Sequence, residues 1–143
     1  QELPERVEAL REELRAARAA EGAARAAWAR LRVERAGEPH GPVPFVRLVT
    51  DDPTALATLA AAAAETRPAH VALLAARSAE RATLLFQAGP EAGAVDVRPA
   101  LQAALAEVEG RGGGAPDRAQ GAGPRIDRLE AALDAAVAAL GEP

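Results

Sequence analysis

The first 31 residues carry apolar side chains at alternating steps of four and three, and no other feature constrains the fold as strongly. The resulting seam contains Leu3, Val7, Leu10, Leu14, Ala17, Glu21, Ala24, Trp28 and Leu31. Such spacing over four heptads is typical of a coiled coil or a long packed helix. Because one amphipathic helix cannot bury its own stripe, the seam requires a partner. We therefore expect residues 1–36 to form a coiled-coil arm that makes a homodimer through Leu3, Val7, Leu10, Leu14, Trp28 and Leu31.

A glycine- and proline-rich linker at 37–44 separates this arm from a region with a different pattern. The later segments predict strands near 43–50, 70–77 and 81–88, and helices near 53–66, 97–107 and 126–140. Asp51 and Asp52 precede Pro53, which is the pattern of a helix cap rather than of a metal site. The sequence thus predicts an α/β fold, with a small mixed sheet flanked by helices in a globular domain at 45–143.

The composition argues against several classes of protein. The chain has no cysteine and only two histidines, His40 and His70, so a disulfide scaffold, a thiolate zinc site and a histidine metal site are not expected. Residues 1–30 are too charged for a signal peptide, and no apolar run is long enough to span a bilayer. We expect a cytoplasmic protein without metal or cofactor.

Because the chain begins with Gln and lacks Met, we also expect it to be a piece of a longer protein.

The segment at 110–123, GRGGGAPDRAQGAG, has a glycine density unlike that of its surroundings. Glycines let a ligand approach backbone N–H groups, which form sites for anions. Arg111 and Arg118 bracket the segment, so both guanidinium groups are available to clamp one phosphate, and Gln120 adds a further polar group. From the residues alone, a phosphate-binding loop and a flexible connection between helices both stay open.

This segment resembles the glycine signature of the DHH-associated domain found at the C-terminus of alanyl-tRNA synthetases, in related editing proteins and in DHH phosphoesterases. The matching residues are Gly112, Gly113, Gly114, Pro116, Ala119, Gln120, Gly121 and Gly123. Arg111 stands where lysine is more common, and Ala115 stands where the family usually has Arg or His. The predicted order of helices and strands also follows the family over essentially the whole chain.

The resemblance implies a non-catalytic module that binds tRNA, in particular alanine tRNA, and dimerises through its arm. Neither the zinc motifs of editing domains nor the DHH motif occurs here, so no catalytic residue is expected. The binding residues implied are Arg111, Gly112, Gly113, Gly114, Arg118 and Gln120. Two alternatives remain: the substrate-binding lobe of a DHH-type phosphoesterase, which would prefer short oligonucleotides, and a module for oligomerisation only.

The charge balance limits how such a module can bind nucleic acid. The net charge is −4, and residues beyond 36 include nine arginines against fourteen acidic residues. On the arm, eight arginines alternate with seven glutamates, which favours an ordinary solvated face. Trp28 lies on the seam, so packing is favoured over stacking on a base. Contact with RNA is therefore expected to be local.

Overall fold

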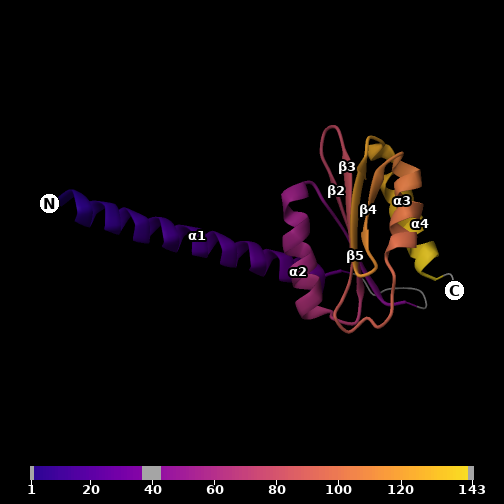
Figure 1. Cartoon of the computed structure of the whole chain (residues 1–143), viewed down its shortest axis with the longest axis horizontal. Coiled ribbons are helices and arrows are strands. Elements are labelled where there is room, and N and C mark those ends of the chain that lie inside the picture. Colours follow the sequence, from indigo (N-terminus) through magenta and orange to yellow (C-terminus); the bar gives the residue numbers. More distant parts are fainter. Residues whose placement is uncertain (1, 37–42, 142–143) are drawn as a thin grey trace.

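The computed structural model describes residues 2–36 and 43–141, with side chains from residue 4 onward. A long helix projects from an α/β body, and its far end lies well away from that body (Figure 1). The elements are α1 (Glu2–Glu34), β1 (Phe45–Thr50), a short 3₁₀ helix η1 (Pro53–Ala55), α2 (Leu56–Thr66), β2 (Val71–Arg77), β3 (Ala82–Ala88), α3 (Arg98–Val108), β4 (Arg111–Ala115), β5 (Arg118–Gly123), a second 3₁₀ helix η2 (Ile126–Arg128) and α4 (Leu129–Leu140).

The five strands form one mixed sheet in the order β1-β2-β3-β5-β4. The crossover through α2 makes β1 and β2 parallel, whereas every other neighbouring pair is antiparallel. The predicted α/β class, with its mixed sheet and long N-terminal helix, is therefore confirmed.

The sheet lies between two helical layers, which Figure 1 shows on either side of the strands. Alternate residues of β2 point to opposite faces: Leu73 packs with α3 and α4, and Leu74 packs with α2 and the end of α1. Residues 71–76 are all buried, which explains the continuous apolar run in the sequence. Phe86 of β3 is fully buried in the layer formed with α3 and α4.

The glycine-rich segment corrects one prediction, because 110–123 is not a loop but contains the hairpin of β4 and β5. Its glycines allow the two backbones and α3 to approach closely. A Cβ atom at Gly112 would lie 2.2 Å from the carbonyl oxygen of Gln120, and one at Gly121 would lie 2.8 Å from a methyl group of Leu105. Glycine density usually indicates a turn or loop. Here it arises from strand and helix packing instead.

Helix α1 docks on the body through a side that differs from the predicted seam. Ala29 and Val33 are fully buried in the layer that contains α2. Because successive helical residues are rotated by about 100°, this face is turned away from the seam. Side chains of the seam stay exposed, at 41% for Val7, 63% for Leu10 and 50% for Leu14. The side chain of Leu3, also assigned to the seam, lies outside the described residues.

This docking predicts that Val33→Ala destabilises the protein by about 2 kcal/mol, because two buried methyl groups leave a cavity between α1 and α2. Urea unfolding, at a concentration where the chain is monomeric, measures the change in the free energy of unfolding. Val7→Ala removes the same groups from an exposed position and serves as the control. Equal effects of the two substitutions would contradict the docked position of α1.

Candidate nucleic-acid interface

The hairpin of β4 and β5 presents one face that no helix covers. Side chains alternate along a strand, and opposite residues of an antiparallel pair share a face. Arg111, Gly113, Arg118 and Gln120 therefore lie on one side, which we call the open hairpin face. The other side faces α3: Ala119 is buried there, and Gly121 is in close contact with Leu105.

The open hairpin face is exposed because α2 covers only the neighbouring strands on this side of the sheet. Leu85 of β3 packs in the layer of α2, yet its cross-strand partner Gln120 is exposed. Every residue of β4 is also exposed. A Cβ atom placed on Gly113 would meet nothing within 4 Å. The backbone of β4 is thus open to close approach by a ligand at Gly113.

Arg111 and Arg118 share this face, but the hairpin places them at its two ends. Arg111 pairs with Ala122, whereas Arg118 pairs with Ala115 next to the turn. The two rows are four residues apart, or about 13 Å along the strands. The two backbones are thus well apart along the hairpin, and a clamp of both arginines on one phosphate stays a prediction.

Hydrogen bonds hold the turn of the hairpin against the body. The N–H of Ala88 donates to the carbonyl oxygen of Asp117 at 2.8 Å, and the N–H of Val97 donates to that of Pro116 at 2.8 Å. The amide of Gln102 on α3 donates to the carbonyl oxygen of Gly112 at 3.1 Å. The face is therefore held by the scaffold and is not a free loop.

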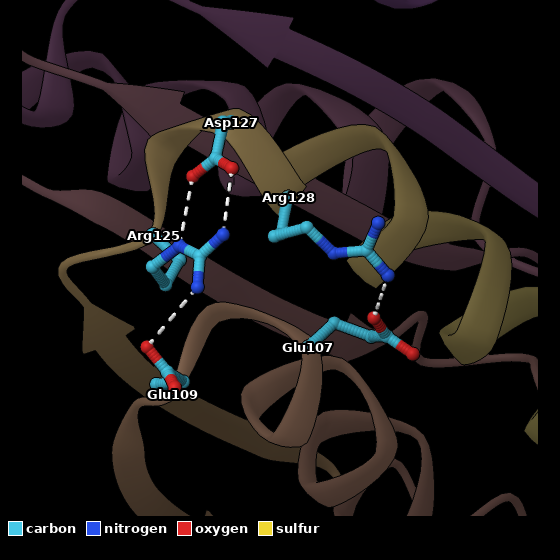
Figure 2. A network of polar contacts seen from close by, with 5 residues as sticks. All are labelled: Glu107, Glu109, Arg125, Asp127 and Arg128. Carbon is cyan, nitrogen blue, oxygen red and sulfur yellow. Dashed lines mark hydrogen bonds and ion pairs between the residues drawn. The ribbon is translucent and has the colours of Figure 1, made fainter.

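An ion-pair network secures the base of the hairpin (Figure 2). Arg125, just after β5, donates from Nε and Nη2 to the two carboxylate oxygens of Asp127, at 3.0 and 2.8 Å, and lies 3.5 Å from Glu109. Its guanidinium lowers the pKa of Asp127, and these carboxylates raise the pKa of Arg125. Arg128 pairs with Glu107 of α3. Both arginines are thus engaged within the protein.

Arginines without a carboxylate partner gather near the open hairpin face. Beyond residue 43, the described arginines that form ion pairs are Arg47, Arg77, Arg98, Arg125 and Arg128. Arg67 bonds to backbone carbonyl groups of α1 and the residues after it. In the same part of the chain this leaves Arg81, Arg111 and Arg118 without an ion pair, and Arg118 contacts the amide oxygen of Gln87.

Arg81 belongs to this group, although the sequence pattern gave no reason to single it out. It lies in the turn between β2 and β3, and together with Arg111 it lines a hollow of about 390 Å³ that also contains Glu80. Sheet pairing brings the two together, because β3 starts at the end of the sheet where β5 ends and β4 begins. Their separation of 30 positions in sequence concealed this proximity.

The described residues show neither a metal centre nor a membrane-crossing helix. Over 2–36 and 43–141, no three His, Asp or Glu side chains gather in a way that would hold a metal ion. None of the helices in this part of the chain combines the length and apolarity needed to cross a membrane. The groups exposed on the open hairpin face are guanidinium groups, an amide and strand backbone.

The comparison with known families decides the classification. The model of the DHHA1 domain matches residues 45–142, which include all five strands and α2 to α4. The chain belongs to the DHHA1 domain family. No curated protein sequence matches it significantly.

A solved structure shows the same fold as this DHHA1 chain. The C-Ala domain from Aquifex aeolicus alanyl-tRNA synthetase superposes with a TM-score of 0.65 at 22% sequence identity. The match covers 74% of this chain and 99% of the C-Ala domain. The resemblance seen in the glycine-rich segment is confirmed at the level of family and fold.

The glycines of the DHHA1 hairpin are predicted to differ in how much substitution by alanine destabilises the protein. Gly112→Ala should lower the free energy of unfolding by roughly 2 kcal/mol or more, since its Cβ would collide with the backbone of β5. Gly113→Ala, which meets open space, should change it by less than about 1 kcal/mol. Chemical denaturation of both variants tests this contrast. If Gly113→Ala were as costly as Gly112→Ala, the hairpin register would be wrong.

Proposed function

We propose that this DHHA1 domain binds tRNA, with alanine tRNA as the expected partner, as a non-catalytic part of an alanyl-tRNA synthetase-like protein. One observation carries the proposal: among the described residues, Arg81, Arg111 and Arg118 have no carboxylate partner and lie around exposed strand backbone, while most other arginines of the body are paired. Phosphate groups are the ligands that such guanidinium groups select.

The same face predicts how RNA is recognised. Phe86 is fully buried, and Phe45 packs against the core, so neither aromatic ring reaches the open hairpin face. Contacts there involve phosphate and sugar more than bases, which favours recognition of RNA shape over sequence. The negative net charge keeps the attraction local, so affinity should be modest and dependent on salt.

The arm supports the second part of the proposal, a homodimer formed through α1. Val7, Leu10 and Leu14 remain exposed at heptad spacing on the part of α1 that extends beyond the body. A second copy of this helix offers a matching stripe, and burying both stripes would stabilise the pair. Leu31 continues the stripe near the body at 43% exposure. Trp28, also assigned to the seam, is 40% exposed and lines a hollow beside α2.

Removing guanidinium groups from the open hairpin face should weaken binding of alanine tRNA. For Arg111→Ala or Arg118→Ala, we expect the slope of log K against log salt to become shallower by about 0.7–0.9 for each lost phosphate contact. Fluorescence anisotropy with labelled tRNA at several salt concentrations measures the slope. Arg98→Ala is the control, because Arg98 is paired with Asp96.

Two outcomes would contradict this assignment. If Arg98→Ala reduced the slope as much as Arg111→Ala did, the open hairpin face would not be the contact. If a short single-stranded oligonucleotide bound more tightly than alanine tRNA at physiological salt, the domain would fit a phosphoesterase lobe better than a tRNA module.

Charge on the exposed seam should abolish dimers. Leu10→Glu and Leu14→Glu each place a charged carboxylate in the apolar seam, where burying it is costly in either helix orientation, so these variants should sediment as monomers. Ala23→Glu adds the same charge on another side of α1 and should leave the dimer intact. Sedimentation velocity over a concentration series measures the oligomeric state of each variant. A dimer that survives both leucine substitutions would overturn the seam as its contact.

A further inference from the structure

A hollow of about 280 Å³ lies where α1 meets the start of α2, on the β1 side of the sheet. Its lining combines a guanidinium group, an indole ring, a carboxylate and hydroxyl groups. The lining residues are Arg25, Trp28, Thr50, Asp52, Thr54, Ala55 and Thr58. Its volume is close to the lower end of the roughly 300–1,000 Å³ typical of small-molecule sites.

The docking of α1 creates this hollow. Ala29 and Val33 are buried against the layer of α2, and this contact holds Trp28 and Arg25 beside the start of that helix. Neither side chain is needed to fill the core, because Trp28 is 40% exposed and Arg25 is also exposed. The functional groups therefore converge on a space that the fold leaves open.

Asp52 has a structural role that uses only part of its carboxylate. Its Oδ1 accepts hydrogen bonds from the N–H of Thr54 at 3.0 Å and from the Thr54 hydroxyl at 2.7 Å, which confirms the predicted cap. These bonds lower the pKa of Asp52, so it is ionised at neutral pH. The Oδ2 atom forms no hydrogen bond among the described residues, and Arg25 forms no ion pair there. An acceptor and a cationic donor are thus left for a ligand.

This combination of groups matches a nucleotide. An indole ring stacks on a base, a guanidinium binds a phosphate, and a carboxylate accepts hydrogen bonds from ribose hydroxyl groups. We propose that the hollow binds one unstacked ribonucleotide, with its base on Trp28, its phosphate on Arg25 and its ribose at Asp52. The proposal rests on RNA as the ligand of the domain and assigns a second contact for it.

Sheet register places the hollow on the same side of the sheet as the open hairpin face, and at the end of that face where Arg111 lies. Thr50, Ala76, Thr83, Ala122 and Arg111 form one row across the five strands. The row spans about 19 Å from β1 to β4. Arg81 lies at this end, in the turn between β2 and β3. One RNA strand crossing this end would reach both sites.

The chain provides its own probe, because Trp28 is its only tryptophan and it has no tyrosine. A base stacked on Trp28 should quench its fluorescence. We expect adenosine 5′-monophosphate to quench the emission of the full chain in a saturable way. Inorganic phosphate at the same concentrations should not. If phosphate reproduced the effect, the hollow would be a general anion site and the nucleotide proposal would fall.

Matched variants separate the roles of the groups. Arg25→Ala should weaken binding of the nucleotide about tenfold or more, since a charged hydrogen bond to its phosphate is lost. Arg18→Ala, seven residues earlier on nearly the same face of α1, should not. Asp52→Ser keeps an N-cap oxygen but removes the carboxylate, so it should abolish the preference for the ribonucleotide over its 2′-deoxy analogue.

The outcomes distinguish this proposal from the function of the hairpin. Absence of saturable quenching up to millimolar nucleotide, or equal weakening by Arg25→Ala and Arg18→Ala, would overturn the hollow as a nucleotide site. If binding of tRNA still depended on Arg111, the hairpin would remain supported as an RNA contact without the hollow. The converse result is also possible: quenching depends on Arg25, but the affinity for tRNA does not change in Arg111→Ala or Arg118→Ala. That result would support the hollow as a nucleotide site and reject the hairpin as the RNA contact.

Discussion

Burial of β2 on both faces is the constraint on which the rest of the structure depends. Every side chain from Val71 to Ala76 is covered, which requires one helical layer on each side of the sheet. On one side, α3 and α4 complete the core, and on the other, α2 does so with the last turns of α1. Because α1 is needed for only part of this cover, most of its length extends beyond the body (Figure 1).

Uneven cover of the sheet produces both candidate sites. Helix α2 covers the inner strands but leaves β4 and β5 open, so Arg111, Arg118 and Gln120 face solvent. At the opposite edge, the docked end of α1 leaves a hollow beside Asp52. The glycines contribute by making the hairpin thin: Gly112 and Gly121 allow close backbone packing, while Gly113 leaves the open side accessible. Packing and access therefore depend on different glycines in the same motif.

Most elements were predictable because they follow the simplest physical patterns. The apolar run of β2 indicates burial, and Asp52 before Pro53 indicates a cap that the structure contains. The hairpin was missed because glycine has low strand propensity, and only pairing with β3 and contact with α3 reveal why it is needed. The docking face of α1 was missed because Ala29 and Val33 form a shorter stripe than the seam, and its partner helix is distant in sequence.

The sequence by itself determined the long amphipathic helix, the α/β class and the glycine motif that marks the DHHA1 family, because these depend on local periodicity and residue type. Tertiary structure decided which side of α1 meets the body, that the glycine-rich segment is a hairpin, and that Arg81 joins Arg111 at one end of the sheet. These outcomes depend on contacts between residues far apart along the chain. Such contacts are set by strand register and helix packing, which local patterns do not encode.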